Sequence, residues 1–170
     1  GGAGAVPGAG CPGNPAQGRL DAQVGAYADE HVKPLAAKWD SENTFPLENF
    51  HALRDQGWLD IPVSKRFGGR GLGLHENPLG WVLVLQQLSK ACGNTGQTFQ
   101  IWGHCMSMVE ELALPEHAAR FTKEAMEGAI WCSGGSEPSN YTQRRHNPLK
   151  ARATIARKVD GGVRVTGRKL

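Results

Sequence analysis

Hydrophobic positions recur at helical spacing through most of the first 128 residues. The first such face lies within residues 20–35 and consists of Leu20, Val24, Tyr27, Ala28, His31 and Leu35. Residues 78–90 are apolar on most sides, which is typical of a helix buried all round, and residues 95–112 continue as a second long helix. A shorter amphipathic helix begins at Pro115 and ends at Gly128. The pattern predicts an all-α helical domain over residues 20–128.

Strand signals replace the helical period after residue 128. Ala129–Ser133 has the character of a short strand, and residues 150–159 alternate in polarity. Asp160–Gly162 then forms a hairpin turn before a return strand. A sheet that ends on one hairpin leaves edges unpaired, so residues 129–170 are expected to be part of a larger antiparallel domain. The predicted fold class is α+β, with a sequence that looks cut short.

Residues 1–19 follow neither pattern. Gly1 to Gly18 contain seven glycines and three prolines, without periodic apolar positions. They also lack the basic and apolar regions of a secretory signal. We expect a disordered tail.

Charge and cysteine content narrow the class of protein. The formal net charge of +3 is too small to indicate a nucleic-acid partner. Residues 140–170 hold nine Lys/Arg against the single acid Asp160, so this segment either attracts phosphates or is a solvated strand face. The four cysteines match no C-x-x-C or zinc spacing, which indicates reduced thiols and a cytoplasmic location. No apolar run approaches the roughly 20 residues of a membrane span.

The stretch with the most chemical promise is residues 131–142, which read W-C-S-G-G-S-E-P-S-N-Y-T. Gly134 and Gly135 allow a flat ligand to approach the backbone, because neither residue carries a Cβ. Ser136 adds a hydroxyl, and Pro138 forces a turn. The residues alone leave two readings open: one edge of a flavin site, or a strand end that turns over a Gly-rich corner.

A second Gly-rich run, Phe67–Gly73, invites a nucleotide-binding interpretation. It lacks the G-x-G-x-x-G spacing and the strand-then-helix context that phosphate binding requires. We therefore predict a tight, buried turn.

Taken in order, the helices, the P-x-x-x-x-F-G-G-x-G-L-G turn, S-E-P and the D-G-G hairpin ending in V-T-G-R-K resemble the N-terminal part of the acyl-CoA dehydrogenase family of flavoproteins. The resemblance covers residues 20–170. It implies a helical domain, a small β-barrel domain that begins here, and a C-terminal four-helix bundle missing from this chain. It also implies FAD, rather than FMN, with backbone contacts from Ser133, Gly134 and Gly135 and the Ser136 hydroxyl at the flavin ring. Thr142 would lie near the pyrophosphate and the thioester.

The same resemblance implies a substrate and a reaction. Residues Gln97, Thr98, Ile101 and Trp102 would line the acyl pocket, although Ile101 and Trp102 are equally well explained as core. The implied reaction is α,β-dehydrogenation of an acyl-CoA thioester with hydride transfer to the flavin, in a homo-oligomer. No catalytic residue is named, because the glutamate base belongs to the missing bundle.

Two other functions remain open. Residues 139–143 read S-N-Y-T-Q where the family has G-A-G-S-D, which gives weight to a reduced-flavin monooxygenase on the same scaffold. A non-catalytic helical module, with the basic β segment binding an acidic partner, is the alternative from a different class.

Overall fold

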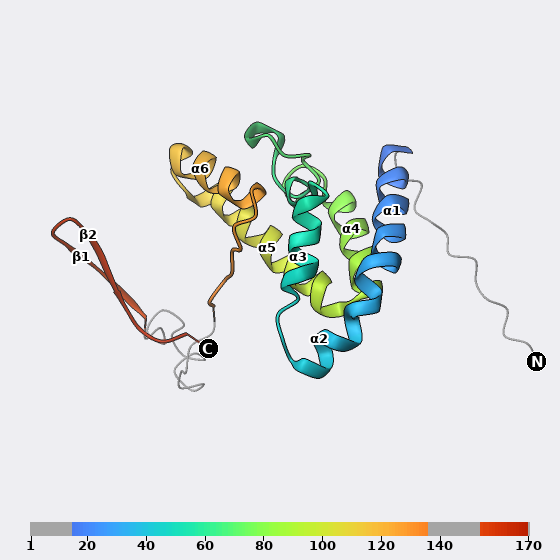
Figure 1. Cartoon of the computed structure of the whole chain (residues 1–170). Coiled ribbons are helices and arrows are strands. Elements are labelled where there is room, and N and C mark those ends of the chain that lie inside the picture. The colour runs from blue at the N-terminus through green and yellow to red at the C-terminus, as the bar shows by residue number, and fades with distance from the viewer. Residues whose placement is uncertain (1–14, 136–153, 170) are drawn as a thin grey trace, which may run out of the picture. The chain divides into compact units, whose positions relative to one another are not determined.

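A computed structural model describes residues 15–135 and 154–169 (Figure 1). The chain divides into two compact units, one that ends at Trp131 and one that begins at Cys132. The first unit is helical, and the second contains a two-stranded antiparallel sheet. This arrangement confirms the predicted α+β class, with a helical domain followed by the start of an antiparallel β domain.

The helical unit is built around two long helices that pack against each other. Its α-helices are α1 (Pro15–Tyr27), α2 (Ala36–Glu42), α3 (Leu47–Asp55), α4 (Pro78–Ala91), α5 (Gly93–Leu112) and α6 (Pro115–Met126). Helix α4 packs against both α1 and α5, and α6 packs on α5 (Figure 1). α1 begins at Pro15, ahead of the expected start at residue 20.

The segment between α1 and α2 departs from regular α-helix. It consists of a π-helical turn, Ala28–Val32, and a 3₁₀ turn, Lys33–Leu35. A π turn is wider than an α turn, so Val32 is buried and His31 is exposed. The prediction that His31 lies on the buried face is therefore wrong. Tyr27, just before the π turn, is half-buried. This burial, and to a lesser extent the negative charge of Asp55, raises the pKa of its phenol above the ordinary value of 10.0.

Aromatic rings from α3, α4 and α5 form the centre of the core. Phe99 stacks on Trp102 with ring centroids 5.8 Å apart, and it also contacts Trp81 at 5.2 Å. Phe50 meets the edge of Trp102 at 5.9 Å. Gly103 makes room for this packing, because a Cβ there would lie 2.5 Å from the Trp81 ring.

Helix α4 is not buried all round, contrary to prediction. Trp81, Val84 and Leu88 are buried, but Leu79 and Val82 remain 41% and 54% exposed. The physical reason is that α1 and α5 cover only part of its surface.

The Gly-rich run forms the tight turn that its sequence predicts. Its backbone folds back on the preceding residues: the Gly71 N–H donates to the Val63 carbonyl at 2.8 Å. A Cβ at Gly73 would lie 2.1 Å from the Pro62 carbonyl oxygen, so only glycine fits there. Two 3₁₀ turns, Trp58–Asp60 and Lys65–Phe67, complete the connection.

The second unit contains one hairpin among its described residues. Strand β1 (Ile155–Val159) pairs with β2 (Gly162–Thr166) around an Asp160–Gly161 turn, and Gly161 has φ 78°. This confirms the predicted D-G-G hairpin. Ala129–Ser133, by contrast, forms no strand, because the two described strands pair only with each other.

Candidate functional site

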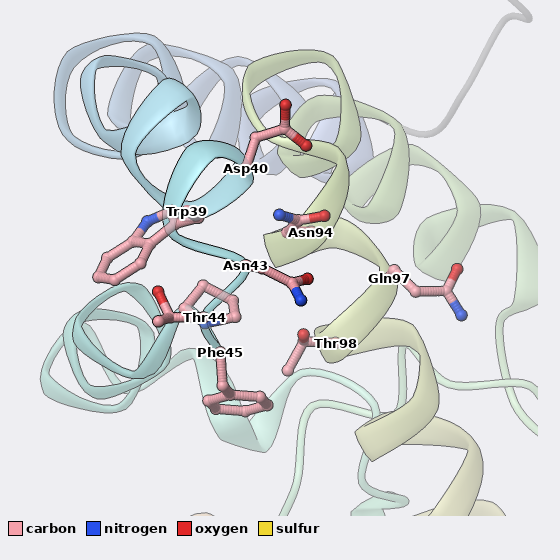
Figure 2. A pocket seen from close by; sticks show the side chains of 9 residues that line it. Trp39, Asp40, Asn43, Thr44, Phe45, Asn94, Gln97 and Thr98 are labelled. Carbon is pink, nitrogen blue, oxygen red and sulfur yellow. The ribbon is translucent and has the colours of Figure 1, made fainter. Parts of the chain in front are cut away.

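A polar pocket of about 370 Å³ lies where the end of α2 meets the start of α5 (Figure 2). One wall is the end of α2 and the loop before α3, and the other is the first two turns of α5. The lining residues are Trp39, Asp40, Asn43, Thr44, Phe45, Pro46, Asn94, Gln97 and Thr98.

The backbone at Asn43 shapes the first wall. Asn43 ends α2 in the left-handed conformation, with φ 50° and ψ 43°. Asparagine is one of the few non-glycine residues that adopt this conformation readily. The N–H groups of Asn43 and Thr44 return to the carbonyls of Asp40 and Trp39, both at 3.3 Å. This cap turns the chain across the start of α5.

The second wall follows from helical spacing. Asn94, Gln97 and Thr98 lie three and four residues apart, so they share one face of α5. In Figure 2, Thr98 points toward Asn43, whereas the Gln97 side chain extends away from both.

Six of the lining side chains are polar, and Asp40 alone is charged. Within the described part of the chain, none of the six has a hydrogen bond or an ion pair with another protein group. Amides and hydroxyls both donate and accept, and the carboxylate only accepts. The pocket therefore offers several unused polar groups to a small polar molecule.

A neighbouring pocket of about 360 Å³ shares Asp40 and Asn94 with the first one. Its other lining residues are Ala36, Ala37, Cys92 and Gly93. The N-terminus of α5 therefore lies between two depressions that have the Asp40 carboxylate in common.

The structure separates the four predicted substrate residues into two pairs. Gln97 and Thr98 line the polar pocket. Ile101 is half-buried against the core, and Trp102 is 1% exposed within it. The Trp102 indole N–H donates to the Ala129 carbonyl at 3.1 Å, so this side chain fastens the end of the helical unit to α5.

The sequence reasoning missed Asp40, Asn43 and Asn94. Asn43 carried a usable signal, since an asparagine just after a helical run is a common left-handed cap. Asp40 and Asn94 carried none, because they meet only through tertiary packing.

The predicted flavin-edge residues lie just after Trp131. That indole packs edge-on against Phe121 with centroids 5.1 Å apart. The following residues Ser133, Gly134 and Gly135 are exposed and lie in the second unit. Within the described part of the chain, none of their backbone N–H groups donates to another backbone group.

The space around Gly134 and Gly135 is open among the described residues. Among the described residues, a Cβ at Gly135 would meet nothing within 4 Å, and one at Gly134 would lie 3.5 Å from the Lys169 side chain, an ordinary contact. An added Cβ at either glycine therefore has room within the described part of the chain. The other two predicted cofactor residues, Ser136 and Thr142, lie outside the described residues.

The described ranges contain neither a metal-ligand cluster nor a membrane-spanning helix. No group of three or more His, Cys, Asp or Glu side chains there could hold a metal ion. No helix there is both long and apolar enough to cross a membrane.

Residues 14–129 match the description "Acyl-CoA dehydrogenase, N-terminal domain". The chain belongs to the acyl-CoA dehydrogenase family. It is 31% identical over 121 residues to "Acyl-CoA dehydrogenase, short-chain specific" from Clostridium acetobutylicum. The aligned region covers 70% of this chain and 31% of that relative. The chain therefore spans less than a third of the relative's length.

Two solved structures share the fold of this chain. A nitroalkane oxidase variant crystallized with 1-nitrooctane matches with a TM-score of 0.73 at 20% identity, over 94% of this chain and 38% of that one. KijD3, in complex with FMN and a dTDP-linked amino sugar, matches with a TM-score of 0.67 at 22% identity, over the same shares of the two chains. At these identities the likeness establishes the fold alone.

Proposed function

We propose that the whole protein is a flavin-dependent oxidoreductase that acts on an acyl thioester, and that this chain supplies its helical domain and one edge of its flavin site. The observation that carries the proposal is the family match over residues 14–129, which covers every helix of the helical unit. A relative that aligns with 70% of this chain is named as a short-chain-specific acyl-CoA dehydrogenase.

The flavin is placed at Ser133–Gly135. The exposed amides of these residues are free of backbone partners in the described part of the chain, and the glycines leave space for a ring. Ser136 is proposed to supply a hydroxyl to the ring, and Thr142 a contact near the pyrophosphate and thioester. FAD is the preferred flavin, and when bound it supplies the hydride acceptor.

The substrate is placed against α5 at Gln97 and Thr98, which face the polar pocket. Ile101 and Trp102 support this wall from behind, because the aromatic core fixes the position of the helix. Such support is how a rigid scaffold holds contact groups in place.

The absorption spectrum of the whole purified protein tests the proposal. We expect the two visible bands of an oxidised flavin, and we expect short-chain acyl-CoA to bleach them without oxygen. A colourless protein that takes up neither FAD nor FMN would contradict the proposal and favour a non-catalytic module.

The same sample distinguishes dehydrogenation from monooxygenation. A dehydrogenase is reduced by acyl-CoA itself. A monooxygenase on this scaffold keeps its colour with acyl-CoA, and after separate reduction it uses oxygen to form an oxygenated product of its substrate.

A further inference from the structure

The hairpin places two arginines directly opposite each other. In the register of β1 and β2, Arg157 pairs with Arg164. Directly opposed residues project from the same side of an antiparallel pair, with Cβ atoms about 4.5–5.5 Å apart. The same face carries the pairs Ile155–Thr166 and Val159–Gly162, so the two guanidiniums are its only charged groups.

The opposite face of the hairpin differs. It presents the pairs Ala156–Val165 and Lys158–Val163, so it carries one cation. Lys158 is exposed, as are both arginines. Lys158 on one face can therefore serve as a control for the arginine pair on the other face of the same two strands.

The described part of the chain supplies no partner for the two arginine side chains. Between residues 154 and 169 the described chain carries five Lys/Arg and one acid, Asp160 at the turn. No hydrogen bond or ion pair joins the side chain of Arg157 or Arg164 to another described group. Like charges directly opposite each other destabilise a strand pair, and a lone two-stranded hairpin is marginally stable. A bound anion would remove this repulsion.

We propose that Arg157 and Arg164 together form a binding site for the phosphoryl group of a phosphorylated small molecule. A phosphoryl group carries close to two negative charges at neutral pH, which balance the charges of two guanidiniums. A single carboxylate would balance only one of them. The planar fork of arginine also suits phosphate oxygens, which it can contact with two parallel N–H donors. The site uses none of the residues proposed for the flavin edge, and it does not depend on the proposed reaction.

Nuclear magnetic resonance of the 170-residue chain tests the site. The backbone amides and the arginine Nε–H groups are followed while inorganic pyrophosphate is added at constant ionic strength. We expect saturable shifts centred on Arg157 and Arg164. Two further titrations, with adenosine 3′,5′-bisphosphate and with ADP, distinguish the phosphate groups of a coenzyme A ester from those of a dinucleotide.

Matched variants separate the site from general charge attraction. Arg157→Gln and Arg164→Gln should each weaken pyrophosphate binding about tenfold or more, since each removes charge-assisted hydrogen bonds. Lys158→Gln removes the same charge from the opposite face and should change binding less than about twofold. The double variant Arg157→Lys/Arg164→Lys keeps the charge and loses the fork, and it should also bind weakly.

Several outcomes would overturn the proposal. Shifts that rise linearly without saturation, or an equal loss in the Lys158→Gln variant, would indicate diffuse counter-ion attraction. Full affinity in the double lysine variant would remove the role of the guanidinium fork. If a single-stranded oligonucleotide binds more tightly per phosphate than pyrophosphate does, the ligand is a nucleic acid and not a small molecule. The cross-strand contacts measured in each variant test whether the hairpin persists. We expect it to persist, because the Gln variants relieve repulsion.

Discussion

The carboxylate of Glu110 joins the Gly-rich loop to α5, and its removal should destabilise the helical unit strongly. One oxygen accepts the backbone N–H of Ser64 at 2.9 Å, and the other accepts the Ser64 hydroxyl. Glu110 and Ser64 are 6% and 5% exposed, so water cannot replace these bonds. The Glu110 carbonyl also accepts from the Arg66 guanidinium at 2.9 Å, but a side-chain substitution leaves that bond in place.

The size of the effect follows from the two bonds. A hydrogen bond to a charged group contributes about 1.5–3 kcal/mol, and an unsatisfied buried donor costs about 1–3 kcal/mol. Glu110→Ala removes the acceptor of two buried donors, so we expect a loss of about 4 kcal/mol in the free energy of unfolding. In Glu110→Gln the amide oxygen can still accept the N–H and the amide nitrogen can donate to the hydroxyl. The loss should then be about 1–2 kcal/mol.

Urea unfolding followed by tryptophan fluorescence measures this loss. All five tryptophans lie in the helical unit, so the signal reports on that unit and not on the hairpin. With a slope of about 2 kcal/mol per molar urea, Glu110→Ala should lower the midpoint by about 2 M.

The adjacent Glu111 provides a matched control. Its side chain is 55% exposed, and its ion pairs with Arg66 and His75 span 3.9 Å and 3.7 Å. Glu111→Gln should therefore cost less than about 0.5 kcal/mol. An equal loss in the two glutamine variants, or a Glu110→Ala midpoint within error of the parent chain, would refute the reasoning.

Other perturbations address the loop, the core and Tyr27. Gly73→Ala should destabilise the unit by more than about 2 kcal/mol, because the new Cβ would lie 2.1 Å from a carbonyl oxygen; Gly18→Ala, whose Cβ meets nothing within 4 Å, should leave the urea midpoint unchanged or raise it. Trp102→Phe should cost about 2 kcal/mol, since it loses volume in the core and the hydrogen bond to the Ala129 carbonyl; a midpoint equal to that of the parent chain would count against this. The raised pKa of Tyr27 means that the folded chain holds the phenol proton more tightly than the unfolded chain, so this stability contribution is present below pH 10 and is lost as the pH rises through the raised pKa. A spectrophotometric titration should show a transition above pH 10 that Tyr27→Phe removes, and its persistence in that variant would contradict the assignment.

Much of the fold was predictable because its signals are local. The apolar period marked α5 and α6, and Pro115 and Gly128 marked the ends of the latter. The Asp160–Gly161 pair marked the hairpin, because a tight turn between strands favours those residues.

The errors arose where packing overrides spacing. Val32 is buried in place of His31 because of a π turn, which the spacing of apolar residues does not reveal. The exposed Leu79 and Val82 look the same in sequence whether or not another segment covers them. Ala129–Ser133 has strand character but no described pairing partner.

The candidate site was predictable only in part. Gln97 and Thr98 were identified through family resemblance, and the structure places both on a polar pocket. The opposite wall, with Asp40 and Asn43, lies more than fifty residues earlier in the chain, so only the tertiary structure brings the walls together.

The FAD affinity of a Gly135→Ala variant tests the central claim most directly. The added Cβ would meet no described atom within 4 Å, so the fold should be unchanged. In the whole protein we predict that this methyl group weakens FAD binding about tenfold, as expected when one or two close hydrogen bonds lengthen. The control Gly18→Ala should bind FAD like the parent protein. Equal FAD affinity in Gly135→Ala and Gly18→Ala would contradict the placement of the flavin at Ser133–Gly135.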